Sequence, residues 1–163
     1  MPLYGALEAG GTKMVCAVGD EQGNILERVS LPTRTPEETM PEMLAFYRGK
    51  DLSALGVGCF GPVDLDRGSP TYGSILATPK LPWRDYPIVQ RFEEALGLPV
   101  GFDTDVNAAA LGEATWGCTR GLSSSIYVTV GTGVGVGVVI DGRPYHGMMH
   151  PEAGHLFVAR HPD

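Results

Sequence analysis

The sequence contains one short pattern twice: two strand-like segments joined by a turn of glycine and threonine, with an acidic-glycine turn after them. In the first copy, residues 3–8 and 14–18 flank Gly-Gly-Thr-Lys at 10–13. In the second, residues 125–130 and 136–140 flank Gly-Thr-Gly-Val-Gly at 131–135. A repeat about 120 residues apart predicts a duplicated fold. The second copy stops at residue 163 before any helix. We therefore expect the chain to be a fragment whose second lobe is truncated.

The segments between the two copies predict the α/β class. A third strand is expected at 25–31, and Thr35-Pro36 is typical of a helix start. Residues 55–60 and 99–102 are expected to form strands, and 88–96 and 106–116 to form helices. Three strands, then helix, strand, helix, strand and helix, indicate a mixed sheet with flanking helices. We expect one lobe at 1–117 and the start of another at 118–163.

Composition narrows the classes of partner. The formal net charge of −7 argues against nucleic acid and against a membrane surface, which are both negatively charged. The three cysteines are widely spaced, as expected of free thiols in a reducing compartment. We find no signal peptide, and the uncharged stretch 126–140 is too short to span a bilayer. We therefore expect a soluble, cytoplasmic protein.

The two glycine-threonine turns are candidate phosphate sites. Backbone amides in such turns can converge on one anion, and a threonine hydroxyl adds a donor. Neither turn has the order of a Walker A loop. A dinucleotide fingerprint must lead into a helix, whereas 136–140 is β-branched, which disfavours a nicotinamide-linked oxidoreductase. Each turn alone could be a plain hairpin, but the pair favours phosphate binding. The candidate ligands are Gly10, Gly11, Thr12, Lys13, Thr132 and Gly133.

Four motifs, at 8–13, 104–113, 131–135 and 151–155, together resemble the ROK family of sugar kinases and repressors in order and spacing. The resemblance covers essentially the whole chain. It implies an actin-like ATPase (ribonuclease-H-like) fold of two lobes, with ATP and a hexose bound in the cleft between them. It also implies a protein close to twice this length, and a homodimer.

Asp105 is the candidate catalytic residue. It stands at the start of a predicted helix, where amides and the helix dipole are expected to favour its ionised form. From position alone it could be an ordinary N-cap. The resemblance implies that it is the general base that takes a proton from the sugar hydroxyl. Thr104 and Asn107 beside it are implied sugar contacts, with a helix-surface position as the alternative for Asn107.

The four histidines all lie within residues 146–161 but fit no complete four-ligand zinc motif. Taken singly, His146, His150 and His161 are expected to be loop residues. The resemblance implies that Glu152 and His155 contact the sugar hydroxyls. It further implies that His155 ligates a structural zinc together with cysteines further along the chain. No cysteine here occupies that place, so we expect this chain to bind zinc poorly.

Residues 61–64, 71–73 and 78–83 resemble the fructokinase branch of the family, and Gly61 and Pro62 are implied substrate contacts. A solvated proline-rich loop is the alternative for this segment. Most ROK kinases have an aspartate where this chain has Glu8, and the resemblance implies that Glu8 helps to hold magnesium through water. Mg²⁺ is expected because charge develops on the transferred phosphoryl group.

The sequence thus predicts an ATP-dependent fructokinase acting on the 6-hydroxyl of D-fructose. Kinases for glucose, mannose or an N-acetylated hexosamine remain alternatives, as does a non-catalytic sugar sensor of the same family. A sugar-responsive repressor is disfavoured, because the first strand begins at Leu3 with no helix-turn-helix ahead of it and because the chain is acidic.

Overall fold

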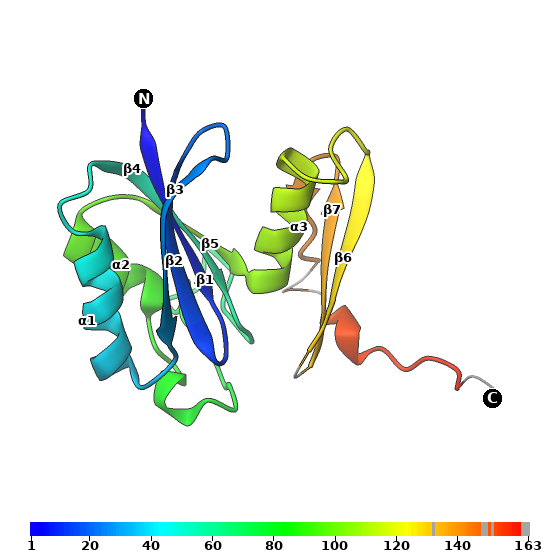
Figure 1. Cartoon of the computed structure of the whole chain (residues 1–163). Helices are drawn as coiled ribbons and strands as arrows, with labels where there is room; N and C mark the ends of the chain where they lie inside the picture. The colour runs from blue at the N-terminus through cyan, green and yellow to red at the C-terminus, as the bar shows by residue number, and fades with distance from the viewer. Residues whose placement is uncertain (132, 148–149, 151, 161–163) are drawn as a thin grey trace.

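The chain folds into two β-sheets with helix α3 between them (Figure 1). The computed structural model describes residues 1–131, 133–147, 150 and 152–160. The larger sheet has the strand order β3-β2-β1-β4-β5. In it β1, β2 and β3 are antiparallel, whereas β1, β4 and β5 are parallel, so the expected mixed sheet is confirmed. Its strands are β1 (Leu3–Ala9), β2 (Lys13–Asp20), β3 (Ile25–Pro32), β4 (Leu52–Cys59) and β5 (Val100–Thr104).

Helices α1 (Pro36–Tyr47) and α2 (Ile88–Leu96) cover one face of this sheet (Figure 1). Thr35 is the N-cap of α1 and Pro36 its first residue, as the sequence predicts. The core lies between these helices and the sheet, where Leu7, Tyr47 and Phe92 are almost completely buried. The Tyr47 hydroxyl donates to the Ala6 carbonyl at 2.6 Å, which ties α1 to β1.

Helix α3 (Asp105–Thr115) covers the other face and also supports the smaller sheet (Figure 1). That sheet consists of β6 (Ser124–Val130), β7 (Val134–Ile140) and β8 (Arg143–Pro144), all antiparallel. A methyl group on Gly135 would lie 2.7 Å from Val106 Cγ1, and one on Gly137 would overlap the Val106 carbonyl. Because glycine has no Cβ, β7 can approach the first turn of α3 closely. These glycines therefore place the β6–β7 hairpin beside Asp105.

The parallel strands end at the same edge of the larger sheet. Ala9 pairs with Cys59, and Cys59 pairs with Thr104, so the last residues of β1, β4 and β5 are neighbours. The glycine-threonine turn follows β1, the Gly61-Pro62 segment follows β4, and α3 follows β5. Ligands in open α/β sheets bind at such carboxyl ends. The fold thus gathers three of the predicted site segments at one edge.

The segment 63–87 has no helical or strand-like periodicity of hydrophobic residues in its sequence, and it is packed against the core. Val63, Ile75 and Trp83 are buried, and isolated bridges join Ile75 to Val63 and to Tyr86. Its only helical turn is the short 3₁₀ helix η1 (Leu81–Trp83). These buried side chains disagree with the alternative of a solvated proline-rich loop.

The remaining elements lie close to their predicted bounds. Strand β7 begins two residues earlier than expected, and β4 three residues earlier. The short strand β8 and the 3₁₀ helix η2 (Ala153–His155) have no periodic signal and were not predicted. The three cysteines are free, as expected. Within the described ranges, every helix is too short or too polar to cross a bilayer.

Candidate active site

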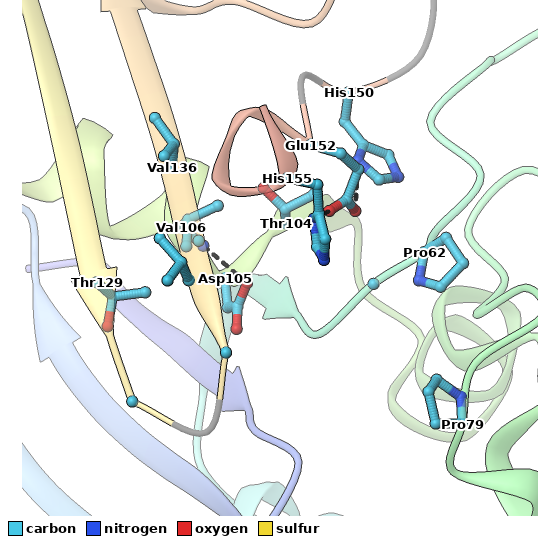
Figure 2. A pocket seen from close by; sticks show the side chains of 15 residues that line it. Pro62, Pro79, Thr104, Asp105, Val106, Thr129, Val136, His150, Glu152 and His155 are labelled. Atoms are coloured by element: carbon cyan, nitrogen blue, oxygen red, sulfur yellow. Dashed lines mark hydrogen bonds and ion pairs between the residues drawn. The ribbon is translucent and has the colours of Figure 1, made fainter. Parts of the chain in front are cut away.

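A cavity of about 710 Å³ opens at the edge where the parallel strands end (Figure 2). Its wall comes from the segment after β4, the start of α3, the β6–β7 hairpin and the segment that contains η2. The structure brings seven predicted site residues together there. They are Gly61, Pro62, Thr104, Asp105, Gly133, Glu152 and His155. Eight further lining residues were not predicted individually as site residues. Val106, Gly131, Val134 and Gly135 lie within the family motifs and Pro79 within 78–83, whereas Thr129, Val136 and His150 lie outside them.

Asp105 is held at the start of α3 with part of its carboxylate free. Thr104, not Asp105, is the N-cap: its hydroxyl oxygen accepts a hydrogen bond from the Asn107 amide at 3.2 Å. The N-cap alternative for Asp105 is therefore wrong. Asp105 Oδ1 accepts from the Val106 amide at 2.9 Å, and the other oxygen has no partner among the described residues. This leaves an acceptor on the cavity wall (Figure 2).

Burial raises the pKa of the Asp105 carboxyl above its usual value, and the nearby carboxylates of Glu8 and Glu152 raise it further. The hydrogen bond from the Val106 amide lowers the pKa of Asp105, but by less. The Val106 amide at the helix terminus thus favours the ionised form, as expected, but the net shift in the pKa of Asp105 is upward. Loss of water and repulsion between like charges outweigh the amide. A carboxylate with a raised pKa is a stronger proton acceptor once it is ionised.

Glu152 lies between two histidines on the cavity wall (Figure 2). Its Oε1 is 3.3 Å from His150 Nδ1, and its Oε2 is 3.2 Å from His155 Nδ1. The His150 side chain is only 6% exposed, and its Nε2 accepts from the Val63 amide at 3.4 Å. His155 is 77% exposed and can move to meet a ligand. His150 is thus a site residue that sequence reasoning missed, and the histidine cluster was the only signal for it.

Asn107 lies behind Asp105 and does not line this cavity. It is completely buried, so the helix-surface alternative is wrong. The side-chain nitrogen Nδ2 of Asn107 donates to Asp103 Oδ1 at 2.8 Å. The other oxygen, Asp103 Oδ2, is 2.7 Å from His146 Nε2. With Glu8, Asn107 lines a second cavity of about 630 Å³ that Asp105 also reaches. The sugar contact predicted for Asn107 is not supported by this placement.

The turn at 10–13 follows β1 directly but does not line the 710 Å³ cavity. The Gly10 amide donates to the Lys13 carbonyl at 3.0 Å, and the Thr33 hydroxyl donates to the Gly10 carbonyl at 2.7 Å. Within the described ranges, the amides of Gly11 and Thr12 have no acceptor. Unpaired amides in a glycine-rich turn suit an anion. The predicted phosphate role of this turn stays a prediction.

In the second turn, the Gly131 amide donates to the Gly133 carbonyl at 2.9 Å, and both glycines line the cavity. Among the residues that the structure describes, no side chain lies within 4 Å of where a Cβ on either glycine would be, so a ligand could approach the backbone closely. Thr132 and His161, which the sequence also singles out, lie outside the described residues.

Metal ligands are sparse in the described part of the chain, where no three histidine, cysteine, aspartate or glutamate side chains cluster. Structural zinc needs four ligands, so the residues described here do not fit it. Magnesium needs only one or two carboxylates besides water and phosphate oxygens. Glu8 lies near enough to Asp105 to raise its pKa and forms no ion pair in the described ranges, so it fits that role.

The chain matches the ROK family over residues 4–163. It is 47% identical over 167 residues to a fructokinase of Zymomonas mobilis, covering 99% of this chain and 56% of the relative. It is 45% identical over 163 residues to a fructokinase of Streptococcus mutans, covering 99% of this chain and 55% of that relative.

A solved ROK glucokinase of Streptomyces griseus, in complex with glucose and AMPPNP, superposes with a TM-score of 0.82 at 34% identity. The superposition covers 96% of this chain and 51% of that one. The chain thus spans about half the length of the relatives it matches. The mixed sheet and its helices agree with the expected actin-like ATPase fold. The chain belongs to the ROK family.

Proposed function

We propose that the protein containing this chain is an ATP-dependent fructokinase, with Asp105 as the general base that activates the 6-hydroxyl of D-fructose. The observation that carries the proposal is the position of Asp105. Its free carboxylate oxygen faces the same cavity as Glu152, His155 and the glycines of the β6–β7 turn. A sugar held by Glu152 and His155 would present a hydroxyl to Asp105, with the γ-phosphoryl group of ATP nearby.

The reaction needs one proton transfer and one phosphoryl transfer. Asp105 accepts the hydroxyl proton while the sugar oxygen bonds to the γ-phosphorus, and the bond from that phosphorus to the β,γ-bridging oxygen breaks. ADP leaves with the electrons of the broken bond. Raising the pKa of Asp105 brings it nearer to physiological pH, where proton transfer to a carboxylate is more favourable. Such a base contributes about 10²- to 10⁴-fold in rate.

The two glycine-threonine turns would hold ATP from opposite sides. The unpaired amides of Gly11 and Thr12, with Lys13, would bind phosphate oxygens from the lobe of residues 1–117. Gly133 and Thr132 would do so from the lobe of residues 118–163. Bound magnesium would neutralise the charge that develops on the phosphates, with Glu8 holding it through water. Closure of the lobes on the sugar would exclude water and limit wasteful hydrolysis of ATP.

We propose fructose rather than glucose as the substrate, because the fructokinases are more similar to this chain than the glucokinases are. Fructokinases match at 42–47% identity, compared with 34% for the glucokinase of Streptomyces coelicolor. Glucose is the second candidate, because the glucokinase that superposes on this chain was solved with glucose. We also propose a homodimer, on the resemblance alone.

The proposal is tested with the protein expressed from its complete coding sequence. A coupled assay of ADP release should give turnover that fructose stimulates more than glucose, mannose or N-acetylated hexosamines. Phosphate on carbon 6 of the product, identified by NMR, would complete the assignment. ATP turnover that no hexose stimulates would contradict the kinase, and a larger kcat/KM for glucose would contradict the fructose assignment.

A further inference from the structure

We propose that Lys80 is a phosphate-binding residue, which supplies a second ammonium group to the polyphosphate held at the 10–13 turn. The inference rests on the proposed function and names a residue that neither glycine-threonine turn contains. Lys80 lies far from the turn in sequence, in the loop between β4 and α2.

The Lys80 side chain lies over the turn. A methyl group placed on Gly11 would be 2.9 Å from Lys80 Cε and 3.8 Å from Lys80 Nζ. The Gly11 amide, on the same residue, has no acceptor in the described ranges. The Lys80 side chain thus lies close to the residue whose amide is unpaired. The ammonium group and the amide are both donors, so only an acceptor such as a phosphate oxygen can use them together.

Neighbouring residues hold the loop and the turn in a fixed relation. The Thr33 hydroxyl and amide donate to the Gly10 and Thr12 carbonyls at 2.7 and 3.0 Å. The residue after Thr33 is Arg34, and its carbonyl accepts a hydrogen bond from Trp83 Nε1 at 2.6 Å. The Trp83 amide in turn donates to the Lys80 carbonyl at 2.8 Å. Residues 33–34 therefore brace both the turn and the Lys80 backbone. A side chain on a braced backbone loses less entropy on binding.

The charge of Lys80 has no other evident use. None of the ion pairs in the described ranges involves Lys80. It is not among the groups that shift the pKa of Asp105, so it does not tune the base. The cavity and its surroundings carry three carboxylates, Glu8, Asp105 and Glu152, which repel a polyphosphate. Cations near the turn offset that repulsion.

Adjacent residues of the Lys80 loop lie at the two proposed substrate sites. Its neighbour Pro79 lines the cavity together with Gly61 and Pro62, whereas Lys80 itself lies at the phosphate turn. One loop would therefore contact the sugar with one residue and the nucleotide with the next. A merely structural Lys80 would disturb both substrates when it is replaced, but a phosphate ligand would affect the nucleotide alone.

The test uses Lys80→Met in the complete protein, because methionine keeps an unbranched stem over Gly11 and removes the charge. We expect KM for ATP, and the calorimetric Kd for inorganic tripolyphosphate, to rise roughly ten- to hundredfold, as for the loss of a charge-assisted contact. KM for fructose should stay within about twofold. Lys80→Arg should recover most of the affinity, and Arg84→Gln, which removes an exposed charge from the same loop, should bind as the wild type does.

Lys80→Gln serves as a second neutral variant if Lys80→Met fails to fold, and should reduce the salt dependence of tripolyphosphate binding. Wild-type affinity for tripolyphosphate in a folded neutral variant would overturn the proposal. A parallel rise in KM for fructose would also overturn it, since that indicates a structural role. If no hexose stimulates turnover but Lys80→Met still weakens tripolyphosphate binding, the phosphate site stands and the fructokinase does not.

Discussion

The charge state of Asp105 is controlled by two opposing local effects. Burial and the carboxylates of Glu8 and Glu152 raise the pKa of Asp105, and the amide of Val106 lowers it. Because the folded protein holds the proton more tightly than the unfolded chain, this group stabilises the fold fully only below its ordinary pKa of 3.8. That stability is lost as pH rises from 3.8 through the raised pKa of Asp105. Once the Asp105 carboxyl is ionised, its burial therefore costs stability.

Replacing Asp105 with asparagine should separate activity from stability. We expect Asp105→Asn to lower kcat about 10²- to 10⁴-fold, through loss of the base. The same variant should melt at a higher temperature than the wild type at pH 7, because a buried charge is removed. The difference in melting temperature should shrink as the pH approaches 3.8, since the wild-type carboxyl is then protonated too. A difference that grew towards acid pH would contradict the pKa assignment.

Thr104 has a structural role at the start of α3, next to Asp105. By accepting from the Asn107 amide it caps α3 and leaves the Asp105 carboxylate free for the cavity. Thr104→Val should lower the free energy of unfolding by about 1 kcal/mol, because the buried amide loses its partner. Thr104→Ser keeps the hydroxyl oxygen and should lower the free energy of unfolding by less. Denaturant unfolding measures both variants, and a larger loss in Thr104→Ser than in Thr104→Val would show that the methyl group matters rather than the cap.

At the scale of elements, the close approach of β7 to α3 assembles the site. Gly135 and Gly137 meet the first turn of α3 at points where a side chain would collide with Val106. The glycines of the second hairpin thus have two physical tasks. Gly131 and Gly133 leave the turn open to a ligand, whereas Gly135 and Gly137 allow the sheet and helix to touch.

Two alanine substitutions test this packing with opposite expected signs. Gly137→Ala would force β7 away from the Val106 carbonyl and should lower the free energy of unfolding by about 1–3 kcal/mol. Gly112 lies within α3, and no described residue outside that helix lies within 4 Å of its Cβ position, so Gly112→Ala should raise the free energy of unfolding by about 0.5–1 kcal/mol. Thermal unfolding of both variants is the measurement. A neutral Gly137→Ala would mean that β7 and α3 can separate without cost.

At the scale of the whole molecule, the site belongs to neither sheet alone. Thr129 and Val136 of the β6–β7 hairpin line one side of the cavity, and Pro62 and Pro79 line the other (Figure 2). Asp105, Glu152 and His155 lie between them. Ligands that bridge the two sides should therefore stabilise the folded molecule as a unit. Binding at a hundredfold excess over Kd contributes about 2.7 kcal/mol.

Thermal shifts can show whether sugar and nucleotide bind in this shared cavity. We expect ATP with magnesium and fructose each to raise the melting temperature of the complete protein, and the two together to raise it further. Glu152→Gln should remove most of the shift that fructose causes and keep the shift that ATP causes. A Glu152→Gln variant with an unchanged fructose shift would place the sugar elsewhere.

The sequence alone determined the order of the elements, the cap of α1, the mixed class of the larger sheet and the position of Asp105 at a helix start. These features depend on backbone preferences and on residues that are neighbours in the chain, so a local pattern is enough to predict them. The family resemblance also predicted seven of the fifteen residues that line the cavity, although their roles stay predictions.

Only the tertiary structure decided the partners and charges of the site. His146 meets Asp103 across 43 residues of sequence, and the Val63 amide meets His150 across 87. Lys80 lies over Gly11, and residues 33–34 form hydrogen bonds to both segments. The upward shift in the pKa of Asp105 likewise depends on burial and on two carboxylates far away in sequence. Such contacts form when separate elements pack together, and no local pattern of residues records them.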